Sequence, residues 1–369
     1  MDILARCKEM EAQGRDVIHM EIGQPDFDTP APITQAGIDA LQGNQTHYTS
    51  AQGLALLRQR ICQYYKERFN VAVDSDQIIV TPGASGALQL ILSYVLQENQ
   101  TLIISDPAYP CNRNLTHLLG GKVLAIPVDG STQFQLNVDL LEKNWCDDVA
   151  AVLVASPSNP TGTVCSKPVL FEMANYLASK NRYLIVDEIY QGLSYDIESE
   201  TVANAYENVF VLNSFSKYFG MTGWRIGWAV APHHAIEQLD AIAQNTYLAS
   251  STIAQHAALA AFLPETIEIL ERRRLVFKQR RDILCHSLEA LGIRVPVIPQ
   301  GAFYVYADIS RYSEDSFSFC RSLLEDQALA ITPGCDFGEY QANKYVRFAY
   351  TTSEARIRQG MKRLKQYLQ

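Results

Sequence analysis

The segment "NSFSKYFGMTGWRIGW", residues 213–228, has an unusual composition. It places one lysine, Lys217, among serines, glycines and aromatic residues, with Arg225 eight positions further on. This spacing fits neither an amphipathic helix, whose apolar residues recur every three or four positions, nor a strand, which tolerates few glycines. Lys217 is therefore expected in a loop, and it needs partners from elsewhere in the chain to explain why a cation lies there.

Short apolar runs around this segment predict a β-sheet. Most are continuously apolar rather than alternating, which is typical of strands covered on both faces in a mostly parallel sheet. They lie at residues 77–81, 101–105, 122–128, 149–155, 182–187, 209–213 and 225–230. Helical patterns at residues 85–98, 167–180 and 234–247 supply the cover. The sequence thus predicts an α/β fold with a seven-stranded sheet sandwiched by helices. The last strand follows a loop and not a helix, so it is a candidate for the antiparallel direction.

The C-terminal third predicts a second, smaller domain. A long charged helical pattern at residues 264–291 is suited to bridging two domains. It is followed by a strand at 303–309, a helix at 316–327, a strand at 345–350 and a terminal helix from Ser353. The first thirty residues are too few to fold alone and are expected to pack on this α+β unit. We therefore expect a large domain of residues 31–265 and a small domain of residues 1–30 and 266–369.

Composition excludes several classes of function. The formal net charge of −9 argues against a nucleic-acid-binding surface, which needs concentrated lysine and arginine. Eight scattered cysteines without a C-x-x-C pair indicate free thiols in a reducing compartment, and none of the seven histidines has metal-ligand spacing. The N-terminus lacks the apolar run of a signal peptide, and no run approaches the roughly 20 residues that span a bilayer. We expect a cytoplasmic protein without a metal, a nucleic-acid partner or a membrane partner.

The residues that follow the predicted strands carry the candidate chemistry. In open α/β sheets, ligands bind beyond the carboxyl ends of the strands. Five strand ends here carry polar or aromatic residues, so these are expected to face one cleft. Their sequences are "PGASGA" (82–87), "DPAYP" (106–110), "SPSNPTG" (156–162), "DEIY" (187–190) and "NSFSK" (213–217).

One end of this cleft is suited to an anion. The turn at residues 83–85 opens a helix, and its backbone N–H groups and hydroxyl point to phosphate binding. Ser214 and Ser216 add hydroxyl donors, and the guanidinium of Arg225 adds a fork that matches phosphate oxygens.

The remaining polar residues require a different chemistry. Asp187 ends an apolar strand, where an unpaired carboxylate is costly, so it needs a cationic or N–H partner. Lys217 also needs a partner, and a lysine that lies near a cation and out of water has a lowered pKa that favours the free amine. A ligand with a phosphate, a protonatable ring nitrogen and an aldehyde satisfies all of these groups. Pyridoxal 5′-phosphate is such a ligand.

The segment around Lys217 resembles the lysine-site motif of class I/II pyridoxal-phosphate-dependent aminotransferases, of fold type I and the aspartate aminotransferase superfamily. The resemblance extends over nearly the whole chain, with its motifs in the family's order. They are "EIGQPDFDTP" (21–30), "HYTSAQGLALLR" (47–58), "TPGASGAL" (81–88), "SDPAYP" (105–110), "SPSNPTGTV" (156–164), "VDEIY" (186–190), "ITPGCDFG" (331–338) and "YVRFAYTTS" (345–353).

The resemblance implies a role for each catalytic residue. Lys217 matches the lysine that forms the Schiff base with the cofactor and then moves the proton between the substrate's Cα and the cofactor. Asp187 matches the acid that keeps the pyridine nitrogen protonated. Asn159 and Tyr190 match the pair that hydrogen-bonds the cofactor's 3′ oxygen.

The resemblance also implies how the cofactor is held. Tyr109 matches the aromatic side chain that stacks on its ring. Phosphate contacts carry over to Ala84 (through its backbone N–H), Ser85, Ser214, Ser216 and Arg225. Tyr48 matches a tyrosine that reaches the phosphate from the neighbouring subunit, which implies a homodimer with sites at the interface.

Substrate recognition follows from the same resemblance. The positions that match the family's substrate-binding residues are Gly23, Asn159 and Arg347. Arg347 matches the arginine that binds the substrate's α-carboxylate through a bidentate pair. The Asp106–Pro107 and Asn159–Pro160 bonds match positions that the family often holds cis. A second arginine for a substrate's side-chain carboxylate is not found, and Ser85 and Phe27, near the substrate in relatives, are uncharged. This favours a neutral amino donor.

The implied function is a ping-pong aminotransferase (EC 2.6.1.-) that moves an amino group from an amino acid to a 2-oxo acid. The alternative is a pyridoxal-phosphate-dependent lyase of the same fold, of the cysteine-S-conjugate β-lyase type, because fold does not fix reaction. The chain begins about twenty residues before "EIGQPDF", whereas relatives usually carry a longer N-terminal arm, so how the dimer is sealed stays open.

Overall fold

The computed structural model describes residues 2–369 and contains a seven-stranded sheet in the order β2-β8-β7-β6-β5-β3-β4. The strands are β2 (Ile78–Thr81), β3 (Thr101–Asp106), β4 (Lys122–Pro127), β5 (Val149–Ala155), β6 (Tyr183–Asp187), β7 (Val209–Ser214) and β8 (Gly227–Val230). Strands β3 to β7 pair in parallel, whereas β8 runs antiparallel to both β7 and β2. The predicted α/β fold is confirmed, including the direction of its last strand.

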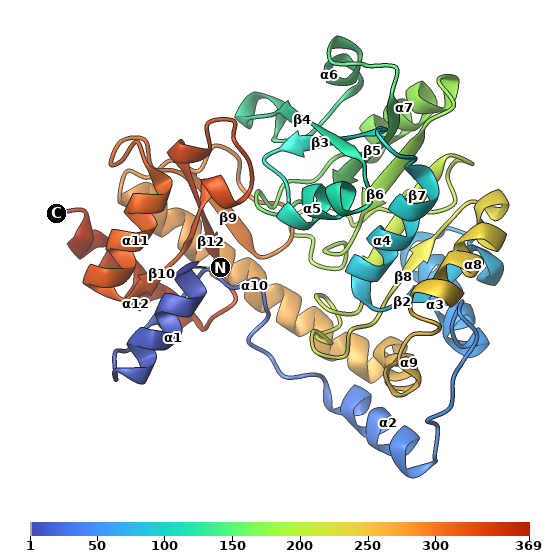
Figure 1. Cartoon of the computed structure of the whole chain (residues 1–369). Coiled ribbons are helices and arrows are strands. Elements are labelled where there is room, and N and C mark those ends of the chain that lie inside the picture. The colour runs from blue at the N-terminus through green and yellow to red at the C-terminus, as the bar shows by residue number, and fades with distance from the viewer. Residues whose placement is uncertain (1) are drawn as a thin grey trace.

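Both faces of this sheet are buried, which is why its strands are continuously apolar. Alternate residues of each strand enter two separate cores; in β5, Val152 and Val154 face one core, and Ala151 and Leu153 face the other. Helices α4 (Gly83–Val95) and α8 (Ile236–Thr246) cover one face, and α3 (Ala55–Phe69) and α7 (Lys167–Ser179) contribute to the core on the other. Helices α5 (Pro110–Leu118) and α6 (Val138–Lys143) lie near the β4 edge (Figure 1).

The C-terminal residues form a second unit around a three-stranded sheet. Its order is β11 (Thr332–Pro333), β12 (Tyr345–Ala349) and β9 (Tyr304–Asp308), all antiparallel. Helices α11 (Ser316–Gln327) and α12 (Glu354–Tyr367) pack beside it. The N-terminal segment contacts this unit, because β1 (Ile18–His19) pairs in parallel with β10 (Leu329–Ala330) and α1 (Asp2–Ala12) docks beside them.

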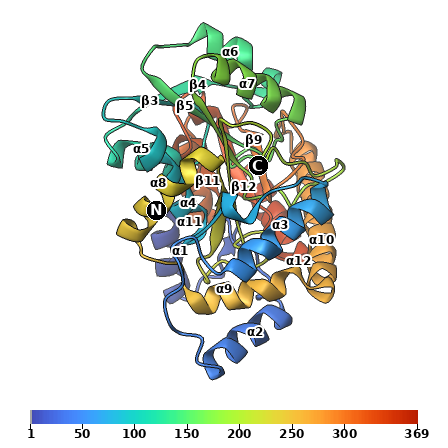
Figure 2. The same cartoon turned by 90° about the vertical axis from the view of Figure 1, so that its right-hand side faces the viewer.

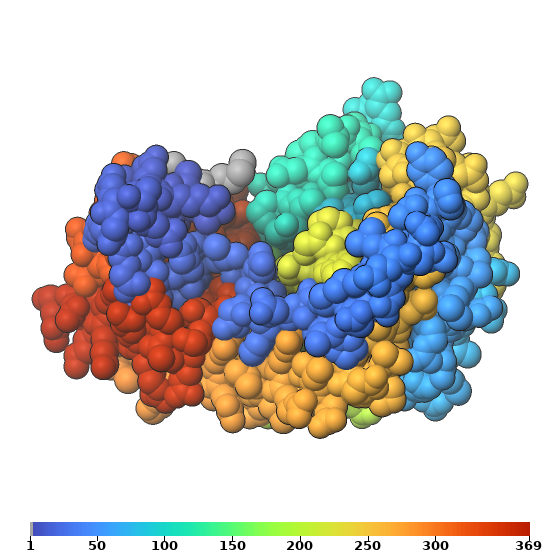
Figure 3. All heavy atoms as spheres, turned by 90° about the horizontal axis from the view of Figure 1, so that it is seen from below, coloured from blue at the N-terminus to red at the C-terminus, as the bar shows by residue number. Residues whose placement is uncertain are grey.

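One long helix connects the two units. Helix α10 (Pro264–Ala290) runs from the base of the seven-stranded sheet to the C-terminal unit (Figure 1). Beneath it, α2 (Ala31–Gln42) packs on α9 (Thr252–Leu259) at the lower end of the molecule (Figure 2). The N-terminal segment covers part of the C-terminal unit and continues across α10 towards the sheet unit (Figure 3). Division into domains 31–265 and 1–30 with 266–369 stays a prediction. Within residues 2–369, no helix combines the length and apolar character that membrane crossing requires.

Candidate active site

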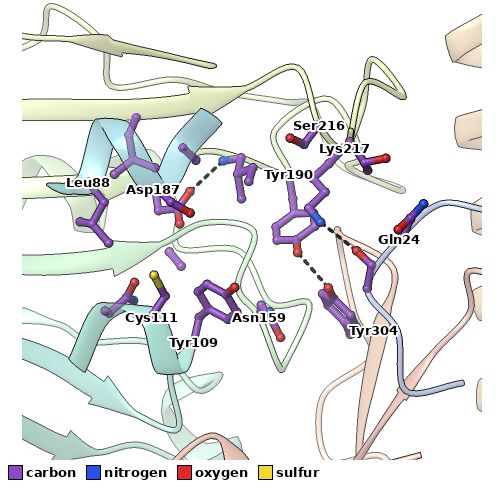
Figure 4. A pocket seen from close by; sticks show the side chains of 18 of the residues that line it. Gln24, Leu88, Tyr109, Cys111, Asn159, Asp187, Tyr190, Ser216, Lys217 and Tyr304 are labelled. Atoms are coloured by element: carbon purple, nitrogen blue, oxygen red, sulfur yellow. Dashed lines mark hydrogen bonds between the residues drawn. The ribbon is translucent and has the colours of Figure 1, made fainter. Parts of the chain in front are cut away.

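The carboxyl ends of the central strands open into a cleft of about 560 Å³. Its walls come from the turns after β2, β3, β5, β6 and β7, together with the N-terminal segment and the C-terminal unit. The close view in Figure 4 shows Lys217, Tyr190 and Tyr304 on one side of this space and Asp187, Cys111 and Tyr109 on the other. Residues distant in sequence thus converge as the positions of the strand ends predict.

Lys217 follows β7 and directs its amine into the cleft. Its Nζ donates a hydrogen bond of 2.8 Å to the carbonyl oxygen of Gly23 (Figure 4). Burial, together with the nearby guanidinium groups of Arg347 and Arg225, lowers the pKa of Lys217 to about 8, although the Asp187 carboxylate opposes the shift. Roughly one-tenth of this amine is therefore neutral, and nucleophilic, at pH 7, far more than for an ordinary lysine.

Asp187 is the last residue of β6 and faces Lys217 across the cleft floor. Its Oδ1 accepts a 3.0 Å hydrogen bond from the Ile189 backbone N–H (Figure 4). Burial raises the pKa of Asp187 to about 6, against the opposing effects of that N–H group and of Lys217. Because a pKa of about 6 lies below neutral pH, most of the Asp187 side chain is still ionised there and can accept a hydrogen bond from a protonated group of a ligand.

The start of α4 forms the anion end of the cleft. Its N-cap residue, Pro82, makes no side-chain capping bond, so the backbone N–H groups of the first turn are available. Arg225 lies against this turn: a Cβ added to Gly83 would come within 2.5 Å of its Nη2. The Nη1 of Arg225 also lies 3.4 Å from the Ser216 Oγ. Helix dipole, guanidinium and hydroxyl together form a site for a doubly charged oxyanion.

Ser214 contacts the anion end of the cleft indirectly, through Ser216. It does not line the cleft; its Oγ donates to Ser216 Oγ at 2.9 Å and accepts from the Ser216 backbone N–H at 3.0 Å. Ser214 therefore orients Ser216, and the expected direct phosphate contact from Ser214 stays a prediction.

Arg347 provides a second cationic end, on β12. Its Nη1 donates to Asn159 Oδ1 at 2.9 Å, and its Nη2 donates to the backbone carbonyl of Glu21. The guanidinium lies 4.3 Å from the ring centre of Tyr304 and 4.7 Å from that of Phe337. Within the described residues its buried Nε has no hydrogen-bond partner. A planar, rigidly held guanidinium of this kind suits a carboxylate ligand.

Tyr304 is the main residue that the sequence did not reveal. It lies on β9, is 1% exposed, and its hydroxyl is 2.9 Å from that of Tyr190 (Figure 4). The same hydroxyl occupies the space where a Cβ on Gly23 would lie, which explains the glycine. Its segment, "FYVYADI", predicts a strand with a buried aromatic face, and nothing in that pattern separates a cleft residue from a core residue.

Most predicted site residues line this cleft. They are Gly23, Ala84, Ser85, Tyr109, Asn159, Asp187, Tyr190, Ser216, Lys217, Arg225 and Arg347. The lining residues that were not predicted include Ile22, Gln24, Leu88, Cys111, Asn112, Thr222, Gly223 and Tyr304. Ile22 and Gln24 are the immediate neighbours of the predicted Gly23, and that adjacency is the only sequence signal that marks them.

Besides Ser214, two predicted residues do not line the cleft of the single chain. Tyr48 is 84% exposed and belongs to a separate surface hollow that also includes His47 and Thr252. Phe27 packs edge to face on Phe277, with ring centres 5.5 Å apart, and does not line the cleft. The Asp106–Pro107 and Asn159–Pro160 bonds are cis, as expected, and so is Ser156–Pro157.

A cluster outside the cleft brings together residues that sequence spacing did not connect. The potential ligand atoms of Cys7, His19 and Glu21 lie within 4.8 Å of one another. His19 Nδ1 is 2.7 Å from Glu21, and its Nε2 is 3.0 Å from Glu11. These carboxylates raise the pKa of His19 to about 9 despite its burial. A protonated imidazole between two carboxylates accounts for this geometry as an ion pair.

The residues of the cleft fit pyridoxal phosphate. The uncapped turn of α4 with Arg225 suits its phosphate, the buried carboxylate of Asp187 suits its ring nitrogen, and the amine of Lys217 suits its aldehyde. Arg347 also lines the cleft, and its guanidinium suits the carboxylate of an amino acid substrate.

Comparison with protein-family models matches residues 15–364 to a family described as "Aminotransferase class I and II". The (5-formylfuran-3-yl)methyl phosphate transaminase of Methanocaldococcus jannaschii is 36% identical, over 100% of this chain and 96% of that protein. The valine–pyruvate aminotransferase of Mycobacterium tuberculosis is 33% identical, over 100% and 95%. Among solved structures, an aminotransferase from Mycobacterium tuberculosis has a TM-score of 0.96 at 33% identity, covering 100% of this chain and 95% of its own. The aspartate aminotransferase of Thermus thermophilus with maleate has a TM-score of 0.94 at 31% identity, covering 100% and 96%.

Proposed function

This chain belongs to the class I and II aminotransferases, and we propose that its cleft binds pyridoxal phosphate and runs a ping-pong exchange of an amino group between an amino acid and a 2-oxo acid. The chain is an aminotransferase (EC 2.6.1.-), and its family uses pyridoxal phosphate. The observation that carries the proposal is the convergence of Lys217, Asp187 and the anion end of α4 in one cleft.

Each end of the cofactor would have its own partners. The phosphate would bind the N–H groups of Ala84 and Ser85, with Ser216 and Arg225. Asp187 would pair with the ring nitrogen, Asn159 and Tyr190 would bond the 3′ oxygen, and Tyr109 would cover the ring. When bound, pyridoxal phosphate supplies an aldehyde that captures amines and a ring that accepts electrons from the substrate's α-carbon.

The side chains then divide the remaining work. Arg347 binds the substrate's α-carboxylate and so fixes which bond at the α-carbon faces Lys217. The amine of Lys217, whose pKa is about 8, can take a proton at one carbon and return it at another near neutral pH. Arg347, Arg225 and Lys217 are the cationic side chains that line the cleft within residues 2–369. Arg225 is assigned to the cofactor's phosphate and Arg347 to the substrate's α-carboxylate. Neither is then left for a carboxylate on the substrate's side chain, which favours a neutral amino donor.

A homodimer is part of the same proposal. Tyr48 is 84% exposed, and the nearby elements carry further exposed apolar side chains, including Leu41, Leu56 and Leu248. A two-fold partner would cover these side chains and bring Tyr48 to the neighbouring phosphate site. Sedimentation velocity tests this point, and a monomer that retains full activity would contradict it.

The decisive experiment is a half-reaction screen. The cofactor-loaded protein is mixed with each amino acid alone, and conversion to the pyridoxamine form is followed by absorbance. Conversion by a neutral amino acid, with release of its 2-oxo acid, is expected. Pyruvate and ammonia released without a 2-oxo acid acceptor would instead identify the lyase alternative. If Lys217→Ala bound the cofactor with an unchanged Schiff-base spectrum, the proposed role of Lys217 would be wrong.

A further inference from the structure

Asp106 is a buried carboxylate outside the cleft lining. It ends β3, three residues before Tyr109, and is 5% exposed. Within residues 2–369 no lysine, arginine or histidine forms a salt bridge with it. Its partners are backbone N–H groups of the C-terminal unit: Glu339 N–H donates to both carboxylate oxygens, at 3.1 and 3.0 Å, and Tyr340 N–H donates to Oδ2 at 3.1 Å. A buried carboxylate needs such bonds in place of water, and the hydrogen bonds to the Asp106 carboxylate come from the backbone of the C-terminal unit.

Gly338 shows how closely the two units meet at this point. A Cβ added to Gly338 would overlap Asp106 Oδ1 and lie 2.6 Å from its Cγ. The φ angle of Gly338 is outside the left-handed region, so its backbone conformation does not require glycine. Glycine is required at position 338 because the carboxylate of Asp106 occupies the space that any other side chain would need.

The same junction connects two residues of the cleft. Ala108 N–H donates a 2.9 Å hydrogen bond to the carbonyl oxygen of Phe337, next to the Asp106 contacts. The ring of Phe337 lies 4.7 Å from the guanidinium of Arg347, and Tyr109 follows Ala108 directly. Segment 106–109 and segment 337–340 therefore hold Tyr109 and Arg347 at a fixed separation across the cleft.

We propose that Asp106 is a positioning residue that clamps segment 337–340 onto the end of β3 and thereby sets Arg347 opposite Tyr109 for substrate binding. This inference rests on the proposed roles of Tyr109 and Arg347. Binding of a substrate carboxylate to Arg347 and closure of the clamp favour each other, because each orders the same segment. Loss of the clamp therefore weakens substrate binding more than it slows chemistry at Lys217.

Asp106→Asn tests the clamp with little change of volume. The amide keeps one acceptor oxygen but replaces the other with a donor that faces N–H groups. Hydrogen exchange of the Glu339 and Tyr340 amides should accelerate at least tenfold. The KM for the best amino donor should rise 10- to 100-fold, while kcat changes less than threefold and the absorbance spectrum of the bound cofactor is unchanged. Asp148→Asn is the matched control, because Asp148 is a half-exposed carboxylate that accepts a hydrogen bond from Thr101 at the opposite end of β3.

A double-mutant cycle with Gly338→Ala separates the clamp from general destabilisation. The cycle combines Gly338→Ala with Asp106→Ala, which removes the carboxylate altogether. Each single variant should raise KM. The double variant should have a KM no higher than that of either single variant, because the carboxylate that would overlap the new Cβ is gone. Additive effects would overturn the proposal, as would faster amide exchange with an unchanged KM, or a fall in kcat alone. Amide exchange needs no substrate, so a wild-type protein that transaminates nothing would refute the proposed function while the structural contact is still measured.

Discussion

The contact between Gly23 and Tyr304 gives the sharpest prediction about the cleft. In Gly23→Ala, the new Cβ would overlap the Tyr304 hydroxyl oxygen and lie 3.0 Å from its Cζ and 3.3 Å from its Cε1. The φ angle of Gly23 is outside the left-handed region, so alanine fits the backbone and the effect is purely steric. Tyr304 cannot retreat freely, because it is fully buried beneath Arg347.

The cost has two parts. Overpacking a close-packed interior costs about 1–3 kcal/mol. Displacing Tyr304 also breaks its 2.9 Å hydrogen bond with Tyr190, which is worth about 1 kcal/mol. We therefore expect Gly23→Ala to lower the free energy of unfolding by roughly 2–4 kcal/mol. It should also displace the carbonyl that accepts from Lys217 Nζ, and so change how fast the protein captures pyridoxal phosphate.

Urea unfolding measures the first effect, and absorbance measures cofactor capture. Gly223→Ala is the matched control, because Gly223 also lines the cleft but a Cβ there would have no neighbour within 4 Å. Gly23→Ala combined with Tyr304→Phe removes the overlapping hydroxyl and should recover at least half of the lost stability. Equal losses in Gly23→Ala and Gly223→Ala, or no recovery in the double variant, would refute the reasoning.

The other predictions concern the charged residues of the cleft. Because the pKa of Lys217 is about 8 and only its neutral amine attacks an aldehyde, the rate of cofactor capture should rise with pH through 8 and then level off; a flat profile from pH 7 to 9 would contradict this. Asp187→Asn keeps the volume but removes the buried charge, so kcat should fall at least about 10²-fold in single-turnover kinetics, and an unchanged kcat would exclude its role. Arg347→Lys loses the planar fork, so the KM for amino donors should rise about 10- to 100-fold with a smaller change in kcat, and the reverse pattern would argue against carboxylate binding.

The sheet could be predicted because burial on both faces leaves a direct mark on the sequence. Val152 and Leu153 enter different cores although they are neighbours, and only an unbroken apolar run satisfies both. Element ends were less predictable: α4 begins at Gly83 rather than at residue 85 and ends at Val95 rather than at residue 98. The first turn of α4 lies against Arg225, a neighbour that is distant in the sequence and that a local pattern does not include.

The site was predictable where motifs carry it and not where packing alone does. Lys217 and Asp187 stand out because a charged residue is costly at the end of an apolar strand. Tyr304 and Tyr306 alternate on one strand as ordinary core aromatics would. The pairing of β9 with β12 sets Arg347 opposite Tyr306 and Ala349 opposite Tyr304, and only the docking of the two units brings the Tyr304 hydroxyl to Tyr190.

The hydrogen bond between Arg347 and the carbonyl of Glu21 joins residues 326 positions apart, and this has a consequence in time. On a ribosome that adds roughly 5–20 residues per second, Glu21 is made about 15–65 s before Arg347. The seven-stranded sheet ends at Val230 and is complete well before then. Amine and anion sites can thus form while the chain is still being made, whereas the carboxylate site waits for its last residues. If the proposed function is right, a nascent chain gains the groups proposed to hold the cofactor before it gains the arginine proposed to bind a substrate's carboxylate.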